Sequence, residues 1–124
     1  MKLKSDFYHI TKMQRTDNGV NFTVHLNADH FIYAAHFPGN PVTPGVCLTQ
    51  MVKELTEELT QESLFLKVVR NVKFTQVLNP LQHAEVTFAL SIPKEDDTGY
   101  KVTAGVESGS ETFAKLNLLF VKRN

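Results

Sequence analysis

Apolar and polar side chains alternate in two short stretches near the start of the chain, residues 7–14 (FYHITKMQ) and 20–26 (VNFTVHL). A period of two is typical of a β-strand with one buried face. Asp17-Asn18-Gly19 separates the two stretches, and Asn-Gly is a strong signal for a tight turn between antiparallel strands. The pattern therefore predicts a β-hairpin. Residues 27–35 are aromatic without a regular period, so we expect an irregular segment there.

From Val46 to about Gln61 the period becomes that of a helix. One stripe of apolar residues runs along it, at Leu48, Met51, Val52, Leu55 and Leu59. A stripe of this width predicts a helix that packs one face against a sheet as core. The other side carries Lys53, Glu54, Glu57 and Glu58. We expect the far end of the helix to meet water and Glu54 to be a solvated charge.

The remaining chain has the pattern of strands. Residues 64–78 are rich in β-branched and aromatic residues and long for one strand, and Asn79-Pro80 ends them. Residues 84–92, 100–107 and 112–121 follow, with an acidic turn at 93–99 and a turn at Ser108-Gly109-Ser110. With one long helix, the sheet is expected to be mainly antiparallel. The sequence predicts an α+β fold in a single domain, residues 1–124.

Prolines and glycines concentrate in residues 36–50, HFPGNPVTPGVCLTQ, just before and within the start of the helix. Thr43 suits the N-cap, Pro44 the first helical position and Gly45 the second. The Thr43 hydroxyl would then satisfy the N–H of Val46 and leave the N–H of Gly45 for a ligand oxygen. With His36 just upstream, the segment combines a titratable base with an anion-stabilising helix start, which indicates part of an active site.

Composition narrows the function classes. The 124 residues are 42% hydrophobic and 21% charged, and 13 basic residues balance 13 acidic ones without a basic block. These features disfavour nucleic acid as a partner. One cysteine suits a reducing compartment, and the sequence has neither the apolar run of a signal peptide nor a membrane span. The prediction is a cytoplasmic globular protein.

The histidines and the cysteine predict no metal site. His9, His25, His30 and His83 lack metal-ligand spacing with one another and with Cys47. Cys47 lies in the first helical turn, where a thiolate would be stabilised, so a Cys47–His36 nucleophile is an alternative. The favoured interpretation is a small buried residue.

The proline-glycine segment resembles the motif of the FabA/FabZ-type 3-hydroxyacyl-(acyl carrier protein) dehydratases, roughly H-F-P-G-x-P-x-x-P-G-x-x-x-x-E. The matching positions are His36, Phe37, Pro38, Gly39, Pro41, Pro44 and Gly45. The segment Val72-Lys73-Phe74 with Asn79-Pro80 is similar to the family's first strand after the helix. The resemblance implies a hot-dog fold, in which an antiparallel sheet wraps around one long central helix.

The resemblance also implies a mechanism. In that family the histidine removes the Cα proton of a 3-hydroxyacyl thioester, and an N–H at the helix start holds the thioester oxygen. An acidic residue on the partner subunit's helix protonates the leaving hydroxyl. These roles fall to His36, to Gly45 with its neighbour Val46, and to residue 50, which is Gln50. An amide cannot give up a proton at neutral pH.

Three hypotheses follow from Gln50. The chain is a dehydratase of fatty-acid or polyketide-type metabolism, in which His36 both takes and returns the proton while Gln50 orients the hydroxyl. Alternatively, it is a hot-dog thioesterase in which Gln50 or His36 places a water. Alternatively, it is a degenerate acyl-thioester binder, half of a heterodimer whose partner supplies the carboxylate.

The resemblance implies further features of the site. Phe31, Tyr33 and Phe37 are candidates for an acyl channel, with a packed aromatic cluster as the alternative. The expected ligand is an acyl chain on the phosphopantetheine thioester of acyl carrier protein or coenzyme A, with no metal or organic cofactor. Because the family's site lies between subunits, we expect a homodimer or higher oligomer, or a heterodimer.

Overall fold

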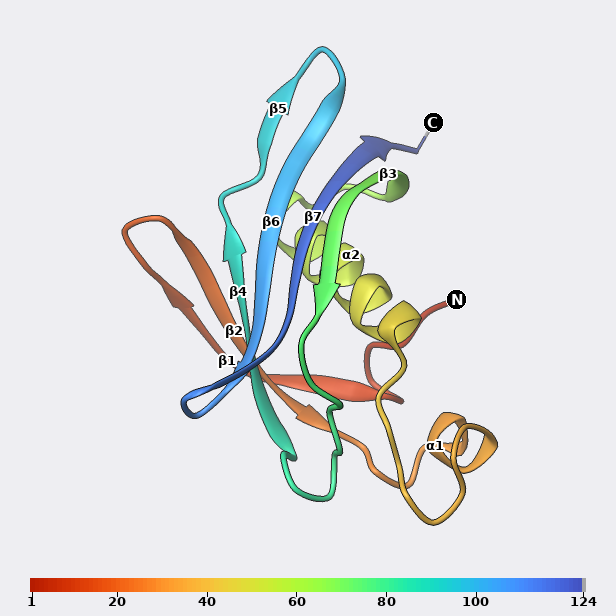
Figure 1. Cartoon of the computed structure of the whole chain (residues 1–124). Helices are drawn as coiled ribbons and strands as arrows, with labels where there is room; N and C mark the ends of the chain where they lie inside the picture. Colours follow the sequence, from red (N-terminus) through yellow and green to blue (C-terminus); the bar gives the residue numbers. More distant parts are fainter. Residues whose placement is uncertain (124) are drawn as a thin grey trace.

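A computed structural model describes residues 1–123 of the chain. Its strands and helices confirm the predicted α+β order and add two short elements (Figure 1). The elements are β1 (Tyr8–Arg15), β2 (Gly19–Leu26), α1 (Phe31–Ala35), α2 (Gly45–Thr60), β3 (Leu64–Phe74), β4 (Glu85–Ser91), β5 (Lys94–Asp96), β6 (Gly99–Ser108) and β7 (Glu111–Lys122).

The strands form one antiparallel sheet of seven strands in the order β1-β2-β4-β6-β7-β3, with the short β5 beside β6. The predicted β1–β2 hairpin is confirmed, with Tyr8 opposite Leu26 and Arg15 opposite Val20. The strand that follows α2 in sequence, β3, pairs with the last strand, β7, and so lies at an edge of the sheet.

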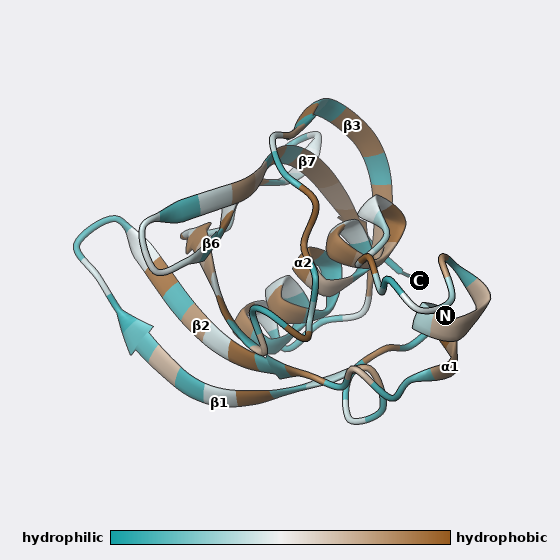
Figure 2. Ribbon diagram, turned by 60° about the horizontal axis from the view of Figure 1, so that its bottom comes forward, coloured by the Kyte–Doolittle hydropathy of each residue, from teal (hydrophilic) through white to brown (hydrophobic). Residues whose placement is uncertain are grey.

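The sheet curves around α2 and encloses it on one side (Figure 2). The predicted apolar stripe of the helix is confirmed as core, because Leu48, Met51, Val52 and Leu55 are buried and Leu59 packs against them. Inward-facing side chains of the strands complete this core, including Phe22, Phe88, Phe113 and Phe120. Burial of this apolar surface is the main stabilisation of the arrangement.

Three expected boundaries were wrong. Residues 27–35 are not wholly irregular, because His30 Nδ1 accepts from the N–H of Ile32 (3.1 Å) and caps the short α1. The strand predicted over 64–78 ends at Phe74, after which Thr75 turns away and donates from its N–H to the carbonyl of Phe113 (2.9 Å). The acidic stretch 93–99 contains β5, which pairs with the start of β6.

Candidate active site

The loop of residues 36–44 joins α1 to α2 and carries His36 (Figure 1). The N–H of His36 donates to the carbonyl of Ile32 (3.0 Å), which makes His36 the C-cap of α1, and its side chain is exposed. Gly39 has a φ of +82° and Phe37 a φ of +65°. A left-handed conformation suits glycine but costs an aromatic residue roughly 1–3 kcal/mol. The chain therefore holds a strained turn directly after the predicted base.

Thr43 anchors the end of this loop. Its N–H donates to the carbonyl of Leu78 (2.8 Å), and its hydroxyl hydrogen-bonds the Tyr33 hydroxyl (3.0 Å) in a buried position. Tyr33 in turn stacks on Phe7, with ring centroids 5.1 Å apart. Burial raises the pKa of Tyr33 to about 12. The loop is therefore tied to the core at the residue before Pro44.

The expected capping by Thr43 was wrong, because its hydroxyl is engaged by Tyr33. The helix begins one residue later than predicted, with Pro44 as an N-cap that makes no side-chain cap hydrogen bond. The first N–H groups bonded back to Pro44 are those of Cys47 and Leu48. Within residues 1–123, the N–H groups of Gly45 and Val46 have no acceptor. The helix start thus presents two donors rather than the one expected, at the positive end of the helix dipole.

The surroundings of these two donors are apolar and open. The Val46 side chain is 67% exposed. The Phe74 ring lies against Gly45, with Cζ 2.6 Å from where a Cβ of residue 45 would stand. Phe74 was not predicted as a site residue, although it ends the strand segment that carries the family resemblance. A planar ring beside two N–H groups can shield a bound carbonyl oxygen from water, which strengthens its hydrogen bonds.

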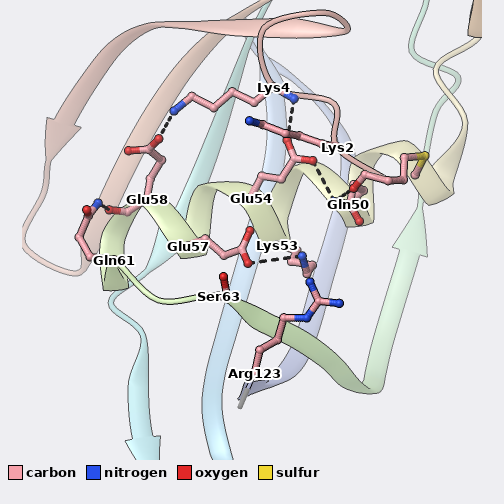
Figure 3. Close-up of a pocket in the computed structure, with 11 residues that line it drawn as sticks. Lys2, Lys4, Gln50, Lys53, Glu54, Glu57, Glu58, Gln61, Ser63 and Arg123 are labelled. Carbon is pink, nitrogen blue, oxygen red and sulfur yellow. Dashed lines mark hydrogen bonds and ion pairs between the residues drawn. The ribbon is translucent and has the colours of Figure 1, made fainter.

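Gln50 lies one turn after Val46 on the same face of α2, about 6 Å along the helix axis at 1.5 Å per residue. Its Nε2 donates to the carbonyl of Met1 (2.7 Å) and to Glu54 Oε2 (2.8 Å). Figure 3 shows Gln50 and Glu54 side by side beneath the first residues of the chain. Gln50 therefore sits in a groove of about 500 Å³ on the side of α2 away from the sheet.

The expectation of a solvated Glu54 was wrong. Its side chain is 7% exposed, because residues 1–8 fold back over this turn of the helix. The negative charge of Glu54 adds to burial in raising the pKa of Tyr8 well above its usual range. The residues that cover Glu54 are Leu3, Lys4 and Tyr8, which lie about 50 positions away in sequence. No local pattern around Glu54 could therefore predict its burial.

The remaining candidates separate into buried and exposed residues. Cys47 is buried against the core, and burial raises the pKa of its thiol, which disfavours the thiolate that a nucleophile needs. Tyr33 is buried, whereas Phe31 and Phe37 are exposed. No hydrogen bond within residues 1–123 joins His36 to Gln50. One copy of the chain therefore brings the donors and Gln50 onto one helix without joining them to His36.

No group of three or more His, Cys, Asp or Glu side chains among residues 1–123 is placed to hold a metal ion. None of the helices in the same range has the length and apolar character needed to cross a membrane.

An antiparallel sheet wrapped around one long helix defines the hot-dog class of proteins, and comparison with solved structures agrees. The chain superposes with a TM-score of 0.70 on the dehydratase heterocomplex ApeI:P from Xenorhabdus doucetiae, at 18% identity, covering 91% of this chain and 96% of that one. It superposes with a TM-score of 0.66 on an uncharacterised protein from Erwinia carotovora subsp. atroseptica, at 21% identity, covering 93% and 92%.

The chain belongs to the ApeI-like family, that of the ApeI dehydratase, whose model matches residues 12–114. It is also similar to two 3-hydroxyacyl-[acyl-carrier-protein] dehydratases named FabZ. The protein of Levilactobacillus brevis is 24% identical over 133 aligned positions, covering 98% of this chain and 88% of that one. The protein of Lactiplantibacillus plantarum is 25% identical over 92 positions, covering 64% and 63%. This chain is thus a hot-dog protein of dehydratase type.

Proposed function

We propose that this chain dehydrates a 3-hydroxyacyl thioester to the corresponding 2-enoyl thioester and water. His36 removes the proton from Cα, and the N–H groups of Gly45 and Val46 bind the thioester oxygen as it gains negative charge. Gln50 holds the 3-hydroxyl. The electron pair of the broken Cα–H bond forms the double bond as the Cβ–O bond breaks. The reaction so written uses no metal or organic cofactor.

The observation that carries this proposal is the uncapped start of α2. Two neighbouring N–H groups without an acceptor among residues 1–123 lie beside an exposed apolar surface. Preorganised donors at a helix start stabilise a developing oxyanion more than the ground-state carbonyl, which is the requirement for catalysis. The Thr43–Tyr33 bond supports this role, because it keeps the threonine hydroxyl from blocking either donor.

Gln50 determines how the proton must travel. Since an amide is no acid at neutral pH, the proton that leaves with the hydroxyl comes from His36 itself. One imidazole that takes a proton at Cα and returns it at the Cβ oxygen works on one face of the substrate, so the elimination is syn. Relative to a site with a separate general acid, we expect a rate lower by roughly 10²–10⁴.

A second copy of the chain completes the proposed site. The edge strand β3 is hydrogen-bonded on one side only and exposes Phe65, Val68 and Val69, which are 49%, 37% and 52% exposed. An exposed apolar edge of this length favours pairing with another strand. We propose that two copies associate along β3, so that His36 of one copy approaches Gln50 of the other.

The substrate is proposed to be carried on a phosphopantetheine arm. The FabZ relatives are named for acyl carrier protein substrates. We extend the carrier class to this chain, with a coenzyme A thioester as the alternative, in fatty-acid or polyketide-type metabolism.

The test is a dehydration assay on a short 3-hydroxyacyl thioester, offered on acyl carrier protein and on coenzyme A. We expect enoyl thioester to form, and His36→Ala to lower the rate roughly 10²–10⁴-fold. His9→Ala is the matched control, because His9 is exposed on β1 and lies opposite His25. Full activity of His36→Ala would exclude the assigned base. Release of a free thiol without enoyl product would indicate a thioesterase instead.

A second candidate function is a thioester-binding subunit of a heterodimer. The amide at position 50 favours it, and a solved structural neighbour is the dehydratase heterocomplex ApeI:P. In that case the chain alone binds acyl thioesters without dehydrating them, and Gln50→Glu restores dehydration. Activity of the unaltered chain by itself would exclude this alternative.

A further inference from the structure

Glu54 receives four hydrogen bonds, two on each carboxylate oxygen. Oε2 accepts from the N–H of Leu3 (2.7 Å) and from Gln50 Nε2 (2.8 Å). Oε1 accepts from the N–H of Lys4 (2.8 Å) and from the Tyr8 hydroxyl (3.0 Å). All four partners are donors, which matches the acceptor-only character of a carboxylate. A buried carboxylate satisfied in this way is fixed in position, because each lost bond would leave a buried donor without a partner.

This carboxylate fixes the orientation of the neighbouring amide. The two partners of Gln50 Nε2 are the carbonyl of Met1 and the carboxylate of Glu54, and both can only accept. An amide turned the other way would place its own oxygen against two acceptors. The nitrogen must therefore face them, and both of its hydrogens are used. Gln50 Oε1 is left for a ligand in the groove along α2 (Figure 3).

We propose that Glu54 is a positioning residue that makes Gln50 a fixed hydrogen-bond acceptor, and that this selects a 3-hydroxyacyl thioester over its 3-oxoacyl counterpart. The inference rests on the proposed function, because it takes the 3-position of the acyl chain to lie at Gln50. A 3-hydroxyl can donate to Oε1, whereas a 3-oxo group presents a second acceptor to it. A freely rotating amide would accept either ligand, by offering its oxygen or its NH₂ group.

The selection has a chemical purpose. Reduction of a 3-oxoacyl thioester yields the 3-hydroxyacyl thioester, so a dehydratase supplied by that reaction meets both compounds on the same carrier. An acceptor fixed at the 3-position rejects the unreduced compound without lowering the affinity for the reduced one. Because Gln50 is only half-buried, we expect discrimination of about tenfold, the value of one net hydrogen bond.

The test compares dissociation constants for 3-hydroxybutyryl-coenzyme A and 3-oxobutyryl-coenzyme A. His36→Ala is the parent, so that turnover during the measurement is slowed roughly 10²–10⁴-fold. In the parent we expect the 3-hydroxy ligand to bind about tenfold more tightly. In Gln50→Leu the ratio should fall to within twofold of one, because the acceptor is removed. In Glu54→Leu it should fall similarly, because the amide loses one of its two acceptors, and Leu3 and Lys4 lose the hydrogen bonds that hold Met1 beside it.

Tyr8→Phe is the matched control. It removes one hydrogen bond to Glu54 Oε1 but leaves Oε2, the atom that holds Gln50. Tyr8→Phe should keep the tenfold ratio of dissociation constants. If Glu54→Leu acted only by loosening residues 1–8, Tyr8→Phe would lower that ratio as well. If Glu54→Leu does not fold, Glu54→Gln takes its place, because an amide at position 54 can donate to Gln50 Oε1 and so no longer fixes the orientation; the ratio should again fall.

Equal binding of the two ligands by the parent would overturn the inference while supporting thioester binding. The same holds for a ratio that persists in a folded Glu54→Leu protein. Failure of the parent to bind either acyl group, on coenzyme A or on acyl carrier protein, would instead contradict the proposed function, and the inference would fall with it.

Discussion

The Phe74 ring occupies the space that a side chain at Gly45 would need, with Cζ only 2.6 Å from the place of a Cβ there. Glycine at this helix start therefore suits the position of the ring as well as access to its own N–H group. The ring is 51% exposed and its far edge makes the contact, so it can swing away if residue 45 gains a methyl group.

We predict that Gly45→Ala lowers kcat/KM at least about tenfold while changing the free energy of unfolding by less than about 1 kcal/mol. Replacing glycine by alanine where the backbone conformation suits both stabilises a protein by about 0.4–1 kcal/mol, which offsets the displaced ring. The measurement is a double-mutant cycle with Phe74→Ala. Because the two groups are in contact, their effects should not add. If the double variant shows the simple sum of both losses, the ring and the glycine act independently.

The second prediction concerns Gln50→Glu. The introduced carboxyl would stand where Nε2 now lies, close to Glu54 Oε2 and the carbonyl of Met1. Only a protonated carboxyl can donate there, so the two carboxyls would share a proton and the introduced one would have a raised pKa. A raised folded-state pKa gives stability that is full below the unfolded value, about 4.3, and is lost as the pH rises.

The variant should therefore be about 1–2 kcal/mol less stable than wild type at pH 7, with the difference closing toward pH 4. Denaturant unfolding at several pH values measures this. Dehydration should be faster than in wild type at pH 5–6, because a protonated carboxyl is a general acid, and the gain should fade with rising pH. Gln50→Leu, which has no titratable group, is the control and should show neither pH trend. A pH-independent stability difference would mean that the carboxyls do not meet.

How far the sequence determines these features can be followed along α2. Its apolar stripe and the strands around it were predictable, because periodicity reports which face is buried. The motif around His36 could be matched because prolines and glycines fix its backbone. Glu54 could not be placed, since its cover comes from Leu3, Lys4 and Tyr8, far away in sequence. A helix as short as α1 is also too brief to show a period.

The N-cap of α2 is a second feature that the local sequence did not predict correctly. Thr43 before Pro44 and Gly45 is a sound local signal for an N-cap. The hydroxyl instead bonds Tyr33, ten residues upstream, because α1 folds back to bring the two together. Local preference was overridden by a tertiary contact, and the result is a second N–H group at the candidate site without an acceptor among residues 1–123.

That contact gives the third prediction. Thr43→Val keeps the shape of the side chain but leaves the buried Tyr33 hydroxyl unpaired, which should cost about 1–3 kcal/mol. Tyr33→Phe should cost a similar amount by orphaning the threonine hydroxyl. The double variant, with both polar groups removed, should be no less stable than either single one. Equilibrium unfolding in denaturant checks this, and additive losses would show that the two hydroxyls do not form a pair.

The fourth prediction tests the edge strand β3. Val69→Lys places a charge at a position on the edge strand that is 52% exposed, so the protein should still fold. If two copies pair along β3, the variant should be monomeric, because like charges would face each other across the pairing. Light scattering during size-exclusion chromatography measures the mass. Lys12→Ala, on β1 at the other end of the strand order, is the control and should leave the mass unchanged. An unaltered dimer in Val69→Lys would place the association elsewhere.

The last prediction concerns alkaline pH. Burial, together with the nearby charge of Glu54, raises the pKa of Tyr8, and burial raises that of Tyr33 to about 12. In the unfolded chain both titrate near 10. A group whose folded pKa is raised stabilises the protein fully below the unfolded value and loses that contribution as the pH rises above it. Between about pH 10 and 12 the free energy of unfolding should therefore fall by about 1.4 kcal/mol per pH unit for each of these tyrosines.

Denaturant unfolding at successive pH values from 8 to 11 measures this slope. Tyr8→Phe should start lower at pH 8, because Glu54 loses one of its donors, but should decline less steeply above pH 10. A decline as steep as that of wild type would show that Tyr8 ionises freely in the folded protein. In that case residues 1–8 would not be closed over Glu54, and the carboxylate that orients Gln50 would be open to water.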